Sequence, residues 1–109
     1  IAGRGLSVQS STAYAAAKGG IIALTRKLSL ELGQSNINVN AIAPSLTLTE
    51  RLMPHWKNRS AESQASEINK VPLKRIATAG DQAGVIAFLL SKDSDFVTGL
   101  TIDVTGGLS

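Results

Sequence analysis

The stretch between Ser10 and Gly33 constrains the fold of this chain most, because it is long, contains no proline and is rich in alanine, leucine and isoleucine. Serine and threonine side chains at its start are favoured helix N-caps, and Gly33 is typical of a helix C-terminus. The stretch therefore predicts one long helix, capped at Gly33 and followed by a turn over residues 34–36.

Apolar residues recur at every third or fourth position of this helix and predict a stripe that faces a core. The stripe consists of Ala17, Ile21, Leu24, Leu28 and Leu32. Ile22 and Leu30 lie off the stripe, so we expect more than one face of the helix to be covered. A sheet on one side and a partner helix on the other would provide that cover.

Two adjacent glycines, Gly19 and Gly20, lie inside this helix. Each costs up to about 1 kcal/mol relative to alanine in a helix interior. Either another backbone approaches the helix closely at this point or the helix has a local kink, and the sequence does not separate the two explanations.

The middle of the chain predicts a strand, a long loop and a weak helix. Residues 36–43 alternate apolar side chains with asparagine, which predicts a strand that runs into Pro44. Residues 45–60 are polar and irregular and hold the only histidine and the only tryptophan, and long loops of this kind often act as lids. A weak helix is expected over Ala61–Lys70, and Pro72 breaks that segment.

The last third of the chain predicts a second strong helix and a final strand. We expect the helix over Gln82–Ser91, with Asp81 as its N-cap. Its large apolar residues are expected to be heavily buried, and they are Val85, Ile86, Phe88, Leu89 and Leu90. Residues 100–104 alternate apolar and polar side chains and predict a strand, which Gly106-Gly107 closes.

The order helix, strand, long loop, helix, strand is that of an α/β protein with a parallel sheet. Two strands do not make such a sheet, and the sequence contains no G-x-G-x-x-G turn, the phosphate-binding element of doubly wound folds. We therefore expect residues 1–109 to be a single partial domain, the C-terminal portion of a doubly wound parallel-sheet Rossmann fold whose dinucleotide-binding first half is absent from this sequence.

Composition and charge argue against several classes of protein. A content of 43% hydrophobic and 17% charged residues is that of an ordinary soluble domain. The net charge of +3 is dispersed among acidic residues, which favours a solvated surface over nucleic-acid binding. The longest apolar run, Val85–Leu90, is too short to cross a bilayer, no signal peptide is evident, and cysteine is absent. We expect a cytoplasmic protein without a membrane segment.

Tyr14 and Lys18 are four residues apart in an alanine-rich part of the long helix, and Tyr14 is the only tyrosine. At this separation both side chains project from the same helix face. A cation beside a phenol favours the ionised phenol, so a tyrosine in this position is suited to proton exchange. The same spacing also fits an aromatic core residue beside a solvated amine, and spacing alone leaves both interpretations open.

Five ordered blocks change the balance between these interpretations. They are YAAAK leading into GGIIALTRKLSLEL, then INVNAIAPS, PLKR, FLLS and VTGLTIDVTGG. Together they make the chain similar to the C-terminal half of a short-chain dehydrogenase/reductase, and the resemblance covers nearly the whole sequence.

The resemblance implies an oxidoreductase that interconverts an alcohol and a carbonyl by hydride transfer with NAD or NADP. It implies that Tyr14 is the general acid/base and that Lys18 binds the nicotinamide ribose and assists ionisation of the tyrosine. The segment beside the nicotinamide is implied to contain Pro44, Ser45, Thr47 and Thr49. The loop beyond it would be the substrate lid, with Met53, His55 and Trp56. Members of the family form dimers or tetramers, so a homo-oligomer, such as a homotetramer, is also implied.

Two residues depart from the family's pattern. Ser45 stands where the family usually has glycine, which raises the question of a positive φ angle at this position. Thr105 stands where aspartate or asparagine usually precedes the paired glycines. Neither substitution removes a group that the implied chemistry needs.

The family's catalytic serine belongs to a Ser-x-x-Gly turn, and matching its glycine to Gly3 places that serine just before Ile1. Three serines of this chain lie too near Tyr14 to replace it and are better explained as helix caps and turn residues, namely Ser7, Ser10 and Ser11. We therefore expect the 109-residue chain alone to bind cofactor poorly and to turn over slowly or not at all.

Other readings of the chain stay open. A catalytically inactive fragment could serve as an assembly piece or as a nucleotide-binding piece. His55 is a lone histidine on a polar loop, with no second ligand at metal-binding spacing, so no metal is expected. The expected partners are a small-molecule alcohol or carbonyl and further copies of the chain, and not nucleic acid or membrane.

Overall fold

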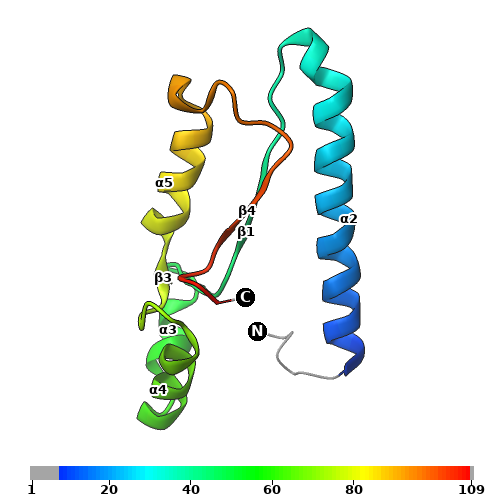
Figure 1. The fold of residues 1–109 in the computed structure, drawn as a ribbon. Coiled ribbons are helices and arrows are strands. Elements are labelled where there is room, and N and C mark those ends of the chain that lie inside the picture. The colour runs from blue at the N-terminus through cyan, green and yellow to red at the C-terminus, as the bar shows by residue number, and fades with distance from the viewer. Residues whose placement is uncertain (1–7, 109) are drawn as a thin grey trace. The chain divides into compact units, whose positions relative to one another are not determined.

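The computed structural model describes residues 8–108 of the chain (Figure 1). Its helices and strands follow in the order α2 (Val8–Leu32), η1 (Gly33–Ser35), β1 (Ala41–Pro44), β2 (Thr47–Leu48), α3 (Met53–Lys57), α4 (Ala61–Lys70), β3 (Ala77–Thr78), α5 (Ala79–Leu89), η2 (Lys92–Ser94) and β4 (Thr101–Val104). The alternation of helices and short strands that the sequence predicts is therefore confirmed.

The chain divides into two compact units, each built from segments that are distant in the sequence. The first contains the residues up to Ala41 together with Ser94–Ile102, and the second contains Ile42–Asp93 together with the residues from Asp103 onward. Helix α2 belongs to the first unit, and helices α3, α4 and α5 belong to the second. That residues 1–109 form one partial domain stays a prediction.

The strands pair across long sequence separations. Strand β1 pairs with β4, and β2 pairs with β3 in parallel, with Thr47 opposite Ala77. Just before β1 and β4, the amide of Gly99 donates to the carbonyl of Val39 at 2.8 Å and the amide of Ala41 donates to that of Leu100 at 2.9 Å. Residue numbers rise together on both segments, so this pair also runs in parallel. The expected α/β class with parallel strands is confirmed.

Helix α2 begins at Val8 and so already includes the serines that were expected to cap it. Its predicted end is right, but the residue with left-handed backbone is Asn36, with φ 61°, and not Gly33, which begins the 3-10 turn η1. Gly19 and Gly20 lie within one continuous helix, and a Cβ built on either meets no atom within 4 Å among the described residues. A close approach at these glycines is therefore not found in this part of the chain.

The face of α2 that is covered differs from the predicted stripe. Ile21 and Leu24 are 49% and 53% exposed, whereas Thr25 and Ser29 are buried. Their hydroxyls donate to carbonyls of their own helix, from Thr25 to Ile21 at 2.7 Å and from Ser29 to Arg26 at 2.7 Å. Because these hydroxyls are satisfied locally, two small side chains can be buried, and at Ser29 the backbone of Gly99 comes close. Periodicity of large apolar residues does not reveal such a face.

The segment before β1 is held by asparagine side chains beside the backbone bond from Gly99 to Val39. Strand β1 begins at Ala41, later than expected. The amide of Asn38 donates to the Asp95 carbonyl at 3.1 Å, and Asn40 bonds both to the Val97 carbonyl at 2.9 Å and to the Leu100 amide at 3.1 Å. The alternating asparagines therefore fasten the loop that precedes β4.

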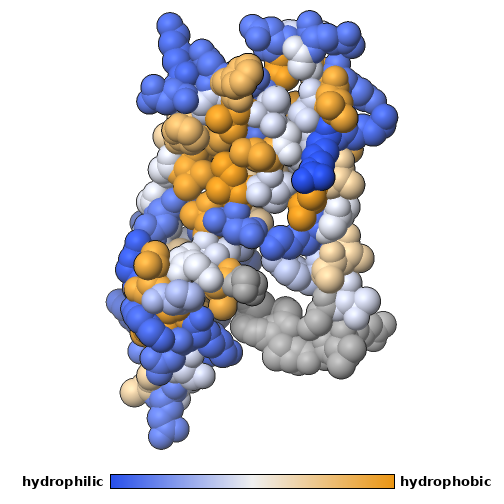
Figure 2. Space-filling model, in the orientation of Figure 1, coloured by the Kyte–Doolittle hydropathy of each residue, from blue (hydrophilic) through white to orange (hydrophobic). Residues whose placement is uncertain are grey.

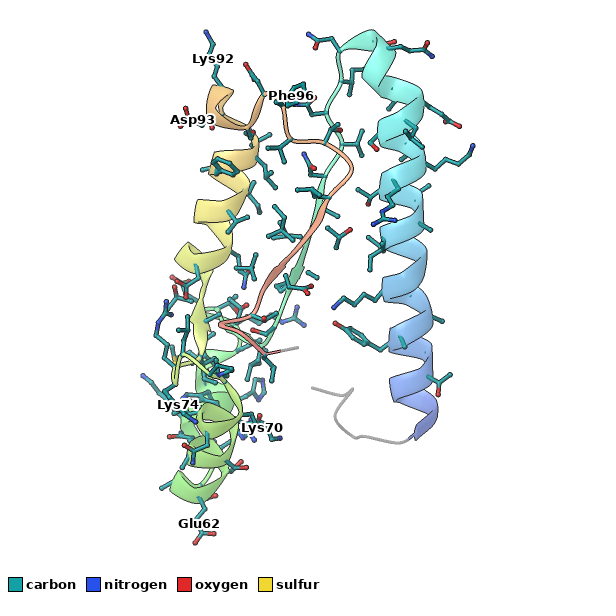
Figure 3. All side chains as sticks on the ribbon, in the orientation of Figure 1. Glu62, Lys70, Lys74, Lys92, Asp93 and Phe96 are labelled. Carbon is teal, nitrogen blue, oxygen red and sulfur yellow. The ribbon has the colours of Figure 1, made fainter. Side chains whose placement is uncertain are left out.

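The predicted loop over residues 45–60 contains strand β2 and helix α3, so its irregular structure is only partly confirmed. Helix α4 has the predicted bounds. Glu62 in its first turn and Lys70 in its last turn carry charges that are favourable to the helix dipole (Figure 3). Lys74, although its φ is 59°, donates from Nζ to the Asn69 carbonyl at 2.8 Å and so caps the end of α4.

Helix α5 begins before the expected position. Thr78 is its N-cap, and Asp81 is the third helical residue, whose carboxylate bonds back to the Thr78 amide in a capping box. Asp81 is therefore wrong as the N-cap, although the spacing T-x-x-D carried the signal for this motif.

Few apolar side chains of the described residues are buried. Among residues 12–108, Val71 is the one apolar residue that is buried, while Ile86, Phe88 and Leu90 of the α5 region are exposed, against the expectation of heavy burial. Figure 2 shows apolar side chains at the surface, and Figure 3 shows Phe96 projecting from its loop. Within residues 8–108, none of the helices combines the length and apolar character needed to cross a bilayer.

Candidate functional site

Tyr14 and Lys18 lie on the helix face of α2 that also carries the buried residues Thr25 and Ser29. At roughly 100° per residue, positions 14, 18, 22, 25 and 29 all fall within an arc of about 80° around the helix axis. Along this arc, Tyr14 is 62% exposed, Lys18 and Ile22 are half-buried, and Thr25 and Ser29 are buried. Tyr14 and Lys18 therefore lie on the same helix face as Thr25 and Ser29, nearer the start of the helix, where the side chains are more exposed.

The polar segment after β1 lies in the second unit and is held by its own side chains and by Gln82 of α5. The Thr47 hydroxyl donates to the Ser45 carbonyl at 2.9 Å and receives the Gln82 amide at 3.3 Å. The Thr49 hydroxyl accepts the Leu52 amide at 3.3 Å at the start of α3. Ser45 is not among the residues with positive φ, so a side chain at this position carries none of the strain that its departure from glycine suggested.

A cavity of about 170 Å³ lies next to this segment within the second unit. It is lined by Ser45, Leu73, Arg75, Ala77, Asp81, Val104, Thr105 and Gly106. Ser45 and Thr105, the two departures from the family's pattern, thus line the same space. Gly106 has φ 65°, and a Cβ built on it would lie 2.7 Å from Val71, so this turn accepts only glycine without rearrangement.

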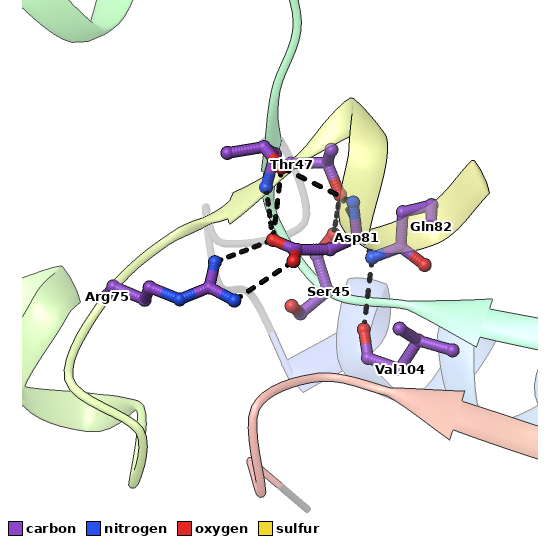
Figure 4. A network of polar contacts seen from close by, with 7 residues as sticks. Ser45, Thr47, Arg75, Asp81, Gln82 and Val104 are labelled. Atoms are coloured by element: carbon purple, nitrogen blue, oxygen red, sulfur yellow. Dashed lines mark hydrogen bonds and ion pairs between the residues drawn. The ribbon is translucent and has the colours of Figure 1, made fainter. Parts of the chain in front are cut away.

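Arg75 and Asp81 form a bidentate ion pair at one wall of the cavity (Figure 4). Guanidinium nitrogens of Arg75 lie 2.6 and 2.9 Å from the two carboxylate oxygens, and the Thr78 amide donates to the same carboxylate at 2.8 Å. These hydrogen bonds, first the one from Arg75 and then the one from Thr78, hold the pKa of Asp81 well below its ordinary range. The same pair raises the pKa of Arg75.

The expected lid residues lie on α3, which is tied to α4. The Arg59 guanidinium stacks over the Trp56 ring at 5.4 Å and donates to the Ser63 hydroxyl at 2.8 Å. The Gln64 amide donates to the Trp56 carbonyl at 2.7 Å. Met53 and Trp56 are half-buried, and His55 is exposed. Among residues 8–108 there is no group of histidine, cysteine and carboxylate side chains that could hold a metal ion.

The structure thus brings the predicted site residues together in two sets. Tyr14 and Lys18 share one helix face of the first unit, and Pro44, Ser45, Thr47 and Thr49 share one segment of the second unit. Ser7 lies outside the described residues.

Comparisons with known proteins decide the family. The sequence model of a family described as enoyl-(acyl carrier protein) reductase matches residues 1–109. The chain belongs to the short-chain dehydrogenase/reductase family. The resemblance seen in the sequence is therefore confirmed at the level of family.

Individual members of the family match most of this chain. Dehydrogenase/reductase SDR family member 4 of Caenorhabditis elegans is 36% identical over 97 residues, which are 88% of this chain and 37% of that protein. Cyclohexanol dehydrogenase of Rhodococcus sp. (strain TK6) is 44% identical over 96 residues, 88% of this chain and 34% of that protein. The chain spans between about a third and two fifths of these relatives.

A solved member of the family has the same fold over the matched part. It is a 3-oxoacyl-(acyl-carrier protein) reductase with bound NAD from Brucella melitensis, 39% identical, with a TM-score of 0.72. The match covers 87% of this chain and 32% of that one. The α/β fold with parallel strands is therefore that of a part of a short-chain dehydrogenase/reductase.

Sequence reasoning missed Arg75, Thr78 and Gln82, which organise the second unit of this family member. The capping spacing T-x-x-D was a usable signal for Thr78. The signal for Gln82 was weaker, since it consisted only of a polar residue at the start of an apolar helix. Nothing in the spacing of Arg75 and Asp81 indicated their ion pair, because it depends on how the chain turns between them.

We expect Asp81→Asn to lower the free energy of unfolding at neutral pH. Since the folded state lowers the pKa of Asp81, its stabilising effect is complete above the unfolded pKa of about 4 and declines as the pH falls further. Urea unfolding of parent and variant between about pH 2.5 and 7 should show two curves that converge below about pH 4. Asp93→Asn, at an exposed aspartate (Figure 3), is the matched control. A constant difference across this range would contradict the prediction.

Proposed function

We propose that these residues form the catalytic and nicotinamide-side part of an NAD- or NADP-dependent oxidoreductase that interconverts an alcohol and a carbonyl. The observation that carries the proposal is the position of Tyr14 and Lys18 on one face of α2, the face that carries the buried Thr25 and Ser29, in a chain of the short-chain dehydrogenase/reductase family. The names of the relatives, several of them dehydrogenases or reductases, support the reaction class.

Tyr14 acts as general acid in reduction and as general base in oxidation. Its phenol donates a proton to the carbonyl oxygen as the alcohol forms, and its phenolate removes that proton in the reverse direction. Lys18, a cation on the same face, stabilises the phenolate and binds the ribose hydroxyls of the cofactor. The nicotinamide dinucleotide supplies or accepts the hydride when it is bound.

The hydrogen bonds of the Pro44–Thr49 segment fit a role in holding the carboxamide. The Thr47 hydroxyl donates its single proton to the Ser45 carbonyl and so has none to donate to the cofactor. Backbone groups near Thr47 would therefore make the contact with the carboxamide. The Thr49 hydroxyl accepts the Leu52 amide and keeps its own proton for an acceptor such as a carboxamide or pyrophosphate oxygen.

A deuterium-transfer experiment tests the proposal. NADH and NADPH labelled at the reactive carbon of the nicotinamide are incubated with a panel of ketones and aldehydes, and the alcohols are analysed by mass spectrometry. We expect the longest native polypeptide that contains residues 1–109 to place deuterium on the former carbonyl carbon. The 109-residue chain, run in parallel, should transfer little or none. If no carbonyl in a chemically broad panel gains label from either cofactor, the proposal is wrong.

An assembly role is the second candidate, and exposed apolar side chains favour it. Leu30, Leu90 and Phe96 are at least 82% exposed, and a homo-oligomer, a dimer or tetramer, would cover such residues. A catalytically inactive piece of this kind, whether for assembly or for nucleotide binding, would transfer no deuterium. Sedimentation of the same polypeptide would show whether it self-associates.

A further inference from the structure

We propose that Gln82 is a positioning residue, which fixes Thr47 and through it the cofactor-facing Pro44–Thr49 segment. This inference rests on the proposed function. Gln82 is 9% exposed and is the one buried residue in α5. A buried amide is unfavourable unless its polar atoms are bonded, so its contacts indicate what it is there to hold.

The amide nitrogen of Gln82 links three elements of the second unit. It donates to the Val104 carbonyl at the end of β4 at 3.1 Å and to the Thr47 hydroxyl in β2 at 3.3 Å (Figure 4). The Thr47 hydroxyl passes its own proton to the Ser45 carbonyl at 2.9 Å. One chain of hydrogen bonds therefore runs from the sheet through α5 to the backbone of the polar segment.

The chain of bonds also determines the state of the Thr47 hydroxyl. Because Gln82 donates to the hydroxyl oxygen, the hydroxyl proton is directed to the Ser45 carbonyl and not elsewhere. Loss of the Gln82 amide would release the hydroxyl to rotate, and the backbone of residues 45–47 would lose its internal bond. The backbone groups that we assign to the carboxamide would then be less well ordered.

The oxygen of the Gln82 amide is unfavourably placed in the folded state. Gln82 Oε1 is buried and has no hydrogen-bond partner among the described residues. An unpaired buried acceptor is unfavourable, so the two bonds made by the amide nitrogen must offset it. Of these two bonds, the one to Thr47 reaches the polar segment.

The test compares cofactor affinity with stability in the longest native polypeptide that contains residues 1–109. For Gln82→Met, we expect the dissociation constants of NADH and NADPH, from their fluorescence, to rise by roughly five- to tenfold. The urea midpoint should fall, because the Val104 carbonyl also loses its donor, and affinity is therefore compared under conditions in which both proteins are folded. The control Gln34→Met removes an exposed glutamine whose side-chain amide donates to the Glu31 carbonyl at the end of α2, and it should change affinity by less than about twofold.

Two variants of Thr47 keep the inference testable if Gln82→Met fails to fold. Thr47→Val removes the hydroxyl and should raise the same dissociation constants, whereas Thr47→Ser retains it and should restore affinity. If Gln82→Met folds, its combination with Thr47→Val should bind no more weakly than either single variant, because both break one chain of bonds.

Each outcome bears on the inference in a defined way. Unchanged affinity in Gln82→Met, or multiplicative losses in the double variant, overturns the action of Gln82 through Thr47 but leaves the proposed function intact. If Gln82→Met does not fold, equal affinities in Thr47→Val and Thr47→Ser overturn the inference. A parent polypeptide that binds neither NADH nor NADPH overturns both proposals.

Discussion

Tyr14→Phe is expected to lower kcat for carbonyl reduction by roughly 10²–10⁴-fold, the usual contribution of a general acid/base. The phenyl ring retains the shape of the side chain and removes only the hydroxyl that exchanges the proton. Since Tyr14 is 62% exposed, the substitution should leave the fold unchanged. The rate is measured as NAD(P)H oxidation in the longest native polypeptide that contains residues 1–109.

Cofactor affinity is the internal control for this variant. The dissociation constant of the cofactor should change by less than about twofold, because Lys18 and not the phenol is assigned to the ribose. A matched pair of lysine variants extends the control, with Lys18→Met weakening cofactor binding and Lys27→Met, at an exposed lysine paired with Glu31 at 3.0 Å, having little effect. If Tyr14→Phe retains affinity and its full rate, the site binds nucleotide without using Tyr14 in catalysis.

Gly99→Ala is expected to lower the free energy of unfolding by about 2–4 kcal/mol. Gly99 has φ 82°, which a residue with a Cβ adopts only with strain. A Cβ at this position would also lie 2.8 Å from the Ser29 hydroxyl oxygen on α2. Backbone strain and a steric clash therefore act together, and urea unfolding measures their sum.

A second substitution separates the two causes. Ser29→Ala removes the oxygen that the new Cβ would meet, so the double variant should recover about 1 kcal/mol of the loss and leave the backbone strain. Gly84→Ala in α5 is the control, because a Cβ built there meets nothing within 4 Å. It should raise stability by about 0.5–1 kcal/mol through helix propensity. Equal effects of Gly84→Ala and Gly99→Ala would contradict the packing of Ser29 against Gly99.

The sequence predicted local elements well where one segment carries the whole signal. The end of α2, the bounds of α4 and the parallel α/β class were right because helix periodicity, breakers and strand alternation are properties of neighbouring residues. The signal for the N-cap of α5 was also local, because the T-x-x-D motif places Thr78 at the N-cap and Asp81 three residues later. The prediction of Asp81 as the N-cap was therefore wrong. The start of β1 was wrong because the side chains of Asn38 and Asn40 make bonds to the facing segment there, beside the backbone bond from Gly99 to Val39.

The candidate site was predictable only in part. Spacing along a helix places Tyr14 and Lys18 on one face, and the ordered blocks indicated the family, which the comparisons confirm. Their roles in catalysis and cofactor binding stay predictions. Spacing could not show that Ser45 needs no positive φ or that Thr47 and Thr49 use their hydroxyls differently, since those facts depend on the local path of the backbone and on its partners.

By itself, the sequence determined the α/β class, the family and the shared helix face of Tyr14 and Lys18, because short-range periodicity and ordered motifs encode them. Only the tertiary structure decided that Thr25 and Ser29 are covered on α2 and that Gln82 joins Thr47 and Val104. The Gln82 contacts join residues 35 and 22 positions apart. Which polar side chains meet across such separations is set by how whole segments pack, and no local pattern of residue types specifies it.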